Sequence, residues 1–446
     1  MNNSQHLDKS MTKKLTVVVA AILAGSFFPG SLYKADGMLI NNCTVIDVPG
    51  HYFLARDIIN STEPACIRIT SDSVILDGRG YRIDGVSAKW STGVIVSGSQ
   101  KIENVTITNL TVLDWYYGIH IENATKSKVE HVTVSNNGPY GIHVVNSTYI
   151  NISHSILTDN GAGICIDQNS LFNKISHNAI YDNLDAIYIL NSDRNTVFNN
   201  SITQNWGGLW IHNSNDNLIY KNEIRDCGDA IWVTFSSSNV IRDNIILDND
   251  GGILIFNHSF YNTITGNVIK NNRYGINLSD YTYSNFIYNN LFNNTVNVFL
   301  ADSGFNIWNG TLSSRENIAG GMFTGGNFWT HPNGSGFSVT CSDENSDGIC
   351  DSPYILNQEN IDYLPLALPQ PAIETVPDNV DDTKEQIVSK YNPSFDWSTQ
   401  TPSRNDVLQA VVNAVIAYFS AQDDAAKQNI LSDVVQMVIL YFSLRS

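Results

Sequence analysis

The most regular feature of the sequence is a pattern of apolar and polar positions that repeats between Gly163 and Phe292. Each copy begins with a small residue and an apolar-x-apolar triplet, and successive copies begin 22 or 23 residues apart. Such alternation is typical of a strand with one buried face. The period accommodates short strands and tight turns but not a βαβ unit, which needs about 30 residues. The copies begin at Gly163, Ala186, Gly208, Ala230, Gly252 and Gly275.

This period predicts a mainly β protein that winds into a right-handed, single-stranded parallel β-helix. Coils stacked about 4.8 Å apart place each apolar residue beside its equivalents, so the core grows with every coil. The triplet also occurs upstream from Cys66 at looser spacing, and Val296 begins a last degenerate copy. We therefore predict about ten coils over residues 66–312.

An asparagine recurs at one place in each copy, between two apolar residues that the pattern assigns to the interior. We interpret these asparagines as an internal ladder, in which each side-chain amide bonds to the next coil. The alternative is a row of exposed turn asparagines. The residues are Asn178, Asn200, Asn222, Asn244, Asn267 and Asn290.

The segments that flank the repeats have a different character. Residues 1–37 resemble an export signal, with lysines before an apolar run that is shorter than the about 20 residues of a membrane span. We expect residues 38–65 and 313–368 to cap the two ends of the β-helix. Residues 369–404 are polar, acidic and dotted with proline, which indicates a linker.

Apolar spacing becomes helical over residues 405–446, where two similar runs predict a small α-helical hairpin. Neither run reaches about 18 uninterrupted apolar residues, so we expect no transmembrane anchor. A hairpin this small buries little surface by itself. We therefore predict that it docks onto a protein partner.

Charge and glycosylation motifs limit the partners and the location. The net charge of −18 excludes nucleic acid as an expected partner, because phosphate binding needs a basic face. Asn-x-Ser/Thr sequons, for example at Asn104 and Asn146, suit a glycoprotein. With the export signal, they predict a secreted protein that is extracellular or on the cell surface.

Six cysteines in an exported chain suggest disulfides. Cys165 and Cys227 belong to coils about 14 Å apart, which is beyond disulfide reach. We expect these two to be free thiols and the other four to form two bridges. The expected bridges are Cys43–Cys66 and Cys341–Cys350.

Two motifs outside the regular block, together with the repeats, resemble the NosD-like right-handed parallel β-helix surface proteins that archaea export. The motifs are Leu-Asp-Gly-Arg-Gly-Tyr-Arg-Ile-Asp-Gly from Leu76 and Gly-Asn-Phe-Trp from Gly326. The resemblance covers residues 40–368 and implies the β-helix fold. The family name implies a copper-related accessory protein, whereas the wider clan implies carbohydrate binding or sugar hydrolysis.

An acidic loop near the C-terminal cap has the spacing of a calcium site. Oxygen ligands at loop positions 1, 3, 5 and 9, glycine at 6 and a carbonyl at 7 follow a calcium loop. Tyr354 stands where a bidentate glutamate is usual, and the alternative is an ion-free turn. The predicted ligands are Asp343, Asn345, Asp347, the carbonyl of Ile349, and Asp351.

The middle residue of each triplet points outward, so these residues form one column on the surface. Tyr188, Trp210 and Trp232 are predicted to stack there as a flat aromatic strip beside His212. Sugar rings pack their C–H faces on aromatic rings while their hydroxyls bond to polar groups. We therefore predict that the strip binds polysaccharide or a surface glycan, although such aromatics can also simply stabilise a sheet.

Two other functions remain open for the same column. Asp185 and Asp229 lie two coils apart, about 10 Å, which is near the spacing of an inverting glycosidase pair. They are the candidate catalytic residues of a polysaccharide-active enzyme, a hydrolase, lyase or epimerase. Copper or zinc could be bound by His120, His143 and Cys165. Because three collinear positions converge poorly on one ion, we consider copper an unlikely cofactor.

Overall fold

The structure, a computed structural model, describes residues 37–368 and three residues of the C-terminal segment. By its contacts the chain divides into two compact units, Met1–Leu368 and Pro369–Ser446. The predicted export signal up to residue 36, the acidic linker and most of the helical hairpin lie outside the described residues. The described C-terminal residues, all helical, are Ala410, Asn413 and Ala414.

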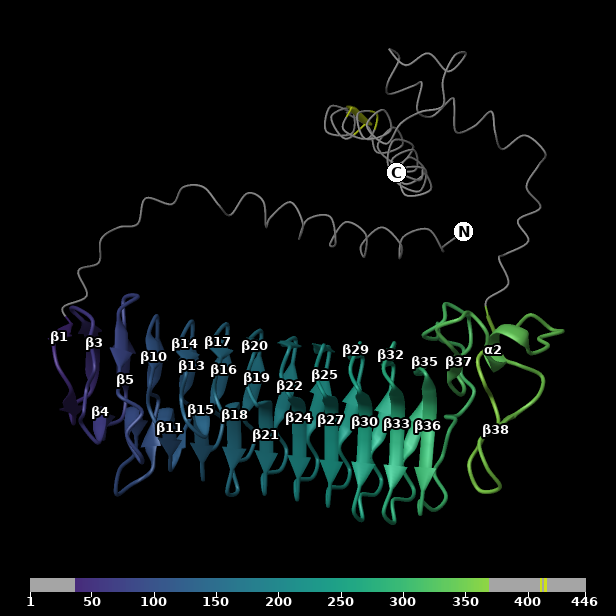
Figure 1. Cartoon of the computed structure of the whole chain (residues 1–446), viewed down its shortest axis with the longest axis horizontal. Coiled ribbons are helices and arrows are strands. Elements are labelled where there is room, and N and C mark those ends of the chain that lie inside the picture. Colours follow the sequence, from purple (N-terminus) through teal and green to yellow (C-terminus); the bar gives the residue numbers. More distant parts are fainter. Residues whose placement is uncertain (1–36, 369–409, 411–412, 415–446) are drawn as a thin grey trace, which may run out of the picture. The chain divides into compact units, whose positions relative to one another are not determined.

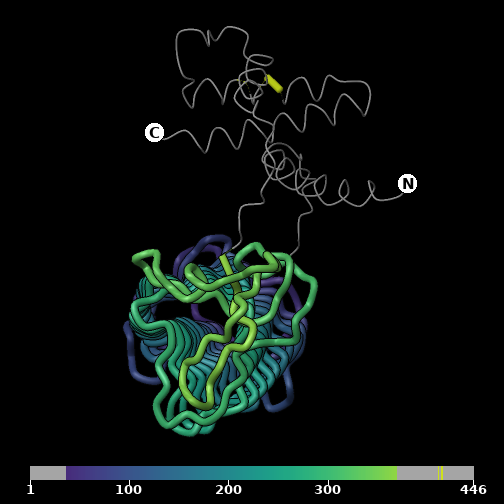
Figure 2. The backbone as a smooth tube through the Cα atoms, turned by 90° about the vertical axis from the view of Figure 1, so that its right-hand side faces the viewer, coloured from purple at the N-terminus to yellow at the C-terminus, as the bar shows by residue number. Residues whose placement is uncertain are grey.

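The first unit is a right-handed parallel β-solenoid of about 11 turns, which confirms the predicted fold (Figure 1). It has one turn more than predicted, because strands within residues 38–54 already pair with the sheets of the solenoid. Each regular coil adds one strand to each of three parallel sheets, here called B, A and C in chain order. Viewed from its C-terminal end, the unit shows successive coils superposed around a common interior (Figure 2).

The strands of the three sheets follow one another regularly along the chain. Sheet A contains β1 (Met38–Ile40), β3 (Gly50–Leu54), β5 (Val74–Asp77), β9 (Thr106–Thr108), β13 (Lys128–Glu130), β16 (Asn151–Ser153), β19 (Lys174–Ser176), β22 (Thr196–Phe198), β25 (Leu218–Tyr220), β28 (Val240–Arg242), β31 (Thr263–Thr265) and β34 (Phe286–Tyr288). Sheet B contains β2 (Thr44–Ile46), β4 (Ala65–Ile69), β7 (Thr92–Val96), β11 (Tyr117–Glu122), β15 (Tyr140–Val145), β18 (Ala162–Asp167), β21 (Asp185–Leu190), β24 (Gly207–His212), β27 (Asp229–Thr234), β30 (Gly251–Phe256), β33 (Tyr274–Ser279) and β36 (Val296–Ala301). Sheet C contains β6 (Arg82–Asp84), β10 (Thr111–Leu113), β14 (Thr133–Ser135), β17 (Ile156–Thr158), β20 (Ala179–Tyr181), β23 (Ser201–Thr203), β26 (Glu223–Arg225), β29 (Ile245–Leu247), β32 (Val268–Lys270), β35 (Leu291–Asn293) and β37 (Phe328–Thr330). A small parallel pair adds β8 (Ile102–Glu103) and β12 (Ala124–Thr125).

The chain bends at left-handed residues between these short strands. In the coil that follows β21, four residues have φ values between 48° and 59°. A left-handed residue reverses the direction of the chain without a long loop, and asparagine tolerates it better than most residues. This explains why polar residues dominate the bends. The four are Asn191, Arg194, Asn199 and Gln204.

The interior consists of aliphatic side chains, one layer per coil. In the coil that starts at β21, Ile187 and Ile189 point inward from sheet B, Val197 from sheet A and Ile202 from sheet C, and all four are fully buried. Their equivalents lie directly above and below them, since the strand registers pair like with like. The predicted inward positions of the triplet are therefore confirmed.

The predicted asparagine ladder is also confirmed. Asn222 donates through Nδ2 to the carbonyl oxygens of Val197 and Tyr220 and to Oδ1 of Asn244, and its Oδ1 accepts from Asn200. The ladder continues through Asn290 to Asn327, whose backbone N–H donates to the carboxylate of Asp362. Three similar rows of buried residues were not predicted. They run from Asn137 to Asn297, from Asn173 to Asn360 and from Ser147 to Ser259.

The C-terminal end of the solenoid is covered by a compact segment. Strand β37 extends sheet C, and Trp329 in it stacks on Phe292 with ring centroids 4.7 Å apart. The helical turn α2 (Phe337–Thr340) follows, and β38 (Tyr354–Ile355) and β39 (Ile361–Asp362) form an antiparallel pair. No helix within the described part of the chain is long and apolar enough to cross a membrane.

Candidate functional site

The outward positions of sheet B form the predicted column, which we call the outer column. Parallel pairing brings the middle residue of each triplet beside its equivalent on the next coil. Because side chains alternate across a strand, these residues share the outer face while their neighbours fill the core. In order, the outer column contains His120, His143, Cys165, Tyr188, Trp210, Trp232, Leu254 and Asn277.

The aromatic part of the outer column does not form the flat strip that we predicted. Tyr188 and Trp210 meet edge to face, with centroids 5.4 Å apart and planes at 76°. Trp210 and Trp232 do the same at 5.7 Å and 83°. Large rings only one coil spacing apart relax into the edge-to-face geometry that aromatic quadrupoles favour. The rings therefore present edges as well as faces to a ligand.

A small cavity of about 190 Å³ opens against this part of the sheet. Trp206, Trp210 and Trp232 supply its aromatic walls, and Asp185, Asp229 and Asp250 supply three carboxylates. Two of the tryptophans belong to the outer column, and Trp206 lies just before β24. The remaining lining residues are Gly207, Gly208, Leu209 and Gly228.

Asp185 and Asp229 occupy one register position, two coils apart, as the sequence spacing predicted. Asp185 pairs with Gly207, and Gly207 pairs with Asp229. A Cβ atom at Gly207 would lie 2.1 Å from Oδ1 of Asp185, and one at Gly251 would lie 2.1 Å from Oδ1 of Asp229. Each carboxylate thus lies over the glycine of the next coil, in space that a side chain would fill.

The environment of both carboxylates favours their protonated forms more than water does. Burial raises the pKa of Asp185, while the Tyr188 hydroxyl, which donates to its Oδ2, opposes that rise. Burial likewise raises the pKa of Asp229; the Trp232 indole opposes the rise and the charge of Asp250 adds to it. The Trp232 Nε1–H lies near the Asp229 carboxylate, although it has no acceptor within strict hydrogen-bonding geometry among the described residues.

Tyr188 and His212, the other two predicted glycan ligands, do not line the cavity. Tyr188 is tied to Asp185 through its hydroxyl. His212 Nδ1 lies 2.9 Å from the Thr234 hydroxyl, which also accepts from Trp210 Nε1 at 3.1 Å. Both residues therefore position groups of the site rather than form its wall.

Sequence reasoning missed Trp206 and Asp250. Trp206 is 67% exposed and lies in the bend before its triplet, where neighbouring coils have no aromatic residue. The residue after that bend, Gly207, is the available signal: a Gly-Gly pair begins only this coil and the coil at Gly251. Asp250 also directly precedes its Gly-Gly pair, so the two missed residues hold equivalent places.

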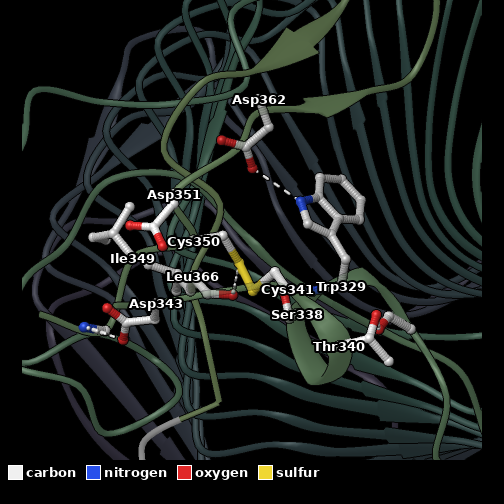
Figure 3. The surroundings of a disulfide bond; sticks show 12 residues. Trp329, Ser338, Thr340, Cys341, Asp343, Ile349, Cys350, Asp351, Asp362 and Leu366 are labelled. Carbon is white, nitrogen blue, oxygen red and sulfur yellow. Dashed lines mark hydrogen bonds between the residues drawn. A yellow bond between two sulfur atoms is a disulfide. The ribbon is translucent and has the colours of Figure 1, made fainter. Parts of the chain in front are cut away.

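The predicted calcium loop folds around its own backbone. The Asp343 carboxylate accepts from the N–H groups of Asp347 at 3.0 Å and Gly348 at 2.9 Å, and Asp347 Oδ1 accepts from Ile349 at 2.8 Å. Asp351 Oδ2 accepts from the backbone of Glu344. Figure 3 shows Asp343 and Asp351 close to the Cys341–Cys350 bridge. Calcium binding by this loop, with Asn345 as a further ligand, stays a prediction.

The structure contains both expected disulfides. Cys43 and Cys66 are joined, as are Cys341 and Cys350. Cys165 and Cys227 are buried free thiols, as predicted. Cys227 occupies a position in the row that runs from Asn137 to Asn297, and its backbone N–H donates to Oδ1 of Asn249.

The N-terminal half of the outer column, which the sequence offered as an alternative copper or zinc site, is largely shielded from solvent. His143 is 7% exposed, neither of its ring nitrogens has a hydrogen-bond partner in the described structure, and burial lowers its pKa to about 3. Burial raises the pKa of the Cys165 thiol, so the thiolate that binds metals is disfavoured. Among the described residues, no group of three His, Cys, Asp or Glu side chains is arranged around an ion. His120, His143 and Cys165 are therefore not part of any such group in the described structure, and copper binding by them stays untested.

Comparison with known families gives one match. The model described as periplasmic copper-binding protein (NosD) matches residues 65–228 and 169–334, which together exceed half of the 446 residues. A search of curated proteins found no match. The archaeal source implied by the sequence resemblance stays a prediction.

Solved structures of similar fold include a tailspike protein, a DFA-IIIase and a mannuronan C-5 epimerase. The Dettilon tailspike protein (gp208) aligns at 15% identity and a TM-score of 0.48, over 59% of this chain and 61% of its own. DFA-IIIase from Arthrobacter chlorophenolicus A6 in complex with GF2 aligns at 15% and 0.45, over 66% and 89%. The A-module of the Azotobacter vinelandii mannuronan C-5 epimerase AlgE4 aligns at 16% and 0.41, over 63% and 90%. The match thus spans less than two thirds of the tailspike, and the likeness concerns the fold alone.

Proposed function

This chain belongs to the NosD family, and we propose that it is a secreted β-helix protein that binds glycan in the cavity between Trp206, Trp210 and Trp232. The single observation that carries the proposal is the composition of this cavity. Three indole rings and three carboxylates meet in one hollow on an otherwise regular sheet. Function therefore concentrates where the coils stop repeating one another.

The chemistry of the cavity suits a sugar. The C–H faces of a pyranose pack on indole rings, and carboxylates accept hydrogen bonds from its hydroxyls. The volume of the cavity, about 190 Å³, is below the about 300–1,000 Å³ of pockets that enclose a drug-sized ligand. A single residue of a longer glycan fits this size better than a free oligosaccharide.

Replacement of Trp206 tests the proposal with the least damage to the fold, because that side chain is 67% exposed. We expect Trp206→Ala to weaken glycan binding about tenfold, and Trp210→Ala with Trp232→Ala to abolish it. A glycan array would identify ligands and calorimetry would measure them. Trp90→Ala, at an indole that is 62% exposed and packed against Tyr116 at an interplanar angle of 51°, is the matched control. Array binding that survives all three cavity substitutions would refute the proposed site.

Several features support a location outside the cytoplasm. The family description is periplasmic, and two disulfides suit an oxidising compartment. The export signal predicted for residues 1–37 agrees with this location. N-terminal sequencing of the protein recovered outside the cytoplasm would show whether the predicted signal is removed. Protein that stays in the cytoplasm with reduced cysteines would contradict this location.

Catalysis is the second candidate, and it rests on the Asp185–Asp229 pair. Their separation of two coils, about 10 Å between backbones, is close to the about 6.5–9.5 Å of inverting glycosidases. Burial raises both pKa values, as a general acid requires. A reducing-end assay on polysaccharides, with Asp229→Asn as the inactive control, decides between binding and turnover.

A further inference from the structure

The cavity carries negative charge that no neighbouring group neutralises fully. Its lining includes Asp185, Asp229 and Asp250 but no lysine, arginine or histidine. Neither Asp185 nor Asp229 forms an ion pair with any described residue, whereas Asp250 lies 3.6 Å from Arg273 in a pair that is more than half exposed. Partly buried carboxylates are normally paired. These two therefore lack a cation that the protein itself does not supply.

The aromatic walls favour the same kind of ligand. Indole faces attract cations through their quadrupole, most strongly where water is excluded. Trp210 and Trp232 line the same cavity as Asp185 and Asp229. A cation held between the carboxylates would thus lie beside indole rings.

We propose that the glycan residue bound in this cavity is an amino sugar with a free, protonated amine, and that its ammonium group lies between Asp185 and Asp229. The inference rests on the proposed glycan binding and names its ligand class. The pyranose ring packs against the tryptophans while the ammonium replaces the missing counter-ion. An N-acetylated sugar has the same ring but no charge, and its acetyl group brings a neutral carbonyl to the carboxylates.

The raised pKa values of Asp185 and Asp229 agree with this assignment, because an arriving cation would stabilise the carboxylates that burial disfavours. The groups that face Asp185 are the Tyr188 hydroxyl from its own strand and Gly207 from the next coil. Asp229 faces Trp232 from its own strand, Asp250, and Gly251 from the next coil. No cationic side chain is among them. The net charge of −18 also attracts cationic polymers towards the protein.

The test compares oligosaccharides of glucosamine and of N-acetylglucosamine, equal in length, by calorimetry with the full chain at about pH 6, where amines are protonated. We expect the glucosamine oligomer to bind about tenfold more tightly, with an affinity that falls as salt is added. Asp229→Asn and Asp185→Asn should each remove most of this preference. Asp248→Asn, at an exposed aspartate of a bend, is the matched control for lost charge and should keep it.

The outcomes separate the inference from the proposed function. Equal or tighter binding of the N-acetylated oligomer that depends on Trp206 would overturn the amino-sugar assignment but keep glycan binding. Binding of neither oligomer, with array binding also absent, would overturn both. Choline binding without binding of either sugar would assign the cavity to a quaternary amine and overturn the sugar.

Discussion

The interior ladder and the outer column lie in the same coils, yet they respond to stacking in opposite ways. Inside, Asn200, Asn222 and Asn244 repeat one residue and hydrogen-bond from coil to coil. Outside, Tyr188, Trp210 and Trp232 differ in orientation and open a cavity. Repetition satisfies buried polar groups, whereas loss of repetition creates a surface that can recognise a ligand.

The acids at the two places show the same contrast. Asp362 ends the ladder, is fully buried and accepts from the backbone N–H groups of Asn327 and Leu364. Figure 3 shows the hydrogen bond that the Trp329 indole donates to it. Asp185 and Asp229 are half-buried and face the cavity without an ion pair to any described residue. Burial raises the pKa of all three carboxyl groups. Only the two outer ones are in reach of a ligand.

The largest expected effect is on the ladder itself. Asn222→Ala removes five hydrogen bonds and leaves buried donors and acceptors on three coils. We expect the free energy of unfolding to fall by about 3 kcal/mol or more, measured by urea denaturation. Ser201→Ala, at an exposed strand position of the preceding coil, should change it by less than about 0.5 kcal/mol. Similar losses for both variants would mean that the ladder is not what stabilises the coils.

The ladder's acidic end predicts a dependence on pH. Burial raises the pKa of Asp362 from 3.8 to about 7, so the folded state holds a proton that the unfolded state has lost between these values. The contribution of Asp362 to the free energy of unfolding should therefore be greatest below pH 3.8 and be lost as the pH rises through about 7. Urea denaturation across this pH range should show that the free energy of unfolding of Asp362→Asn depends less steeply on pH than that of the unchanged protein. An unchanged slope would assign the pH dependence to other groups, such as Asp185 and Asp229.

The smallest effect is a gain in stability. Cys227 interrupts the row from Asn137 to Asn297 between Asn205 and Asn249, and its thiol donates to the carbonyl oxygen of Arg225 in its own bend at 3.3 Å. Cys227→Asn restores a donor and an acceptor at that rung, so we expect about 1 kcal/mol of added stability. Thermal denaturation of Cys165→Ser, at a buried thiol between His143 and Tyr188 that belongs to no asparagine row, provides the contrast. Destabilisation by Cys227→Asn would show that this coil has adapted to sulfur.

Much of the solenoid was predictable because stacking imposes one rule on every coil. The triplet residues Ile187 and Ile189 pointed inward and Asn200 joined a ladder, as the period required. The additional rows through Asn183 and Asn195 were missed, although their residues recur with the same period of 22 or 23 residues and, like Asn200, directly follow left-handed residues. A bend can be made by Arg194 as well as by Asn191, so its position is not marked by composition alone.

The sequence by itself determined the parallel β-helix, the interior ladder, the order of residues in the outer column and the pairing of cysteines, because each depends only on spacing along the chain. Only the tertiary structure decided that Trp206 and Asp250 join Trp210, Trp232, Asp185 and Asp229 in one cavity, and that Tyr188 and His212 stay outside it. The physical reason is that side-chain packing, here the edge-to-face tilt of large rings and the space left by Gly207, is set by neighbours on other coils. Such neighbours are 22 or 23 residues away in sequence but in contact in the fold.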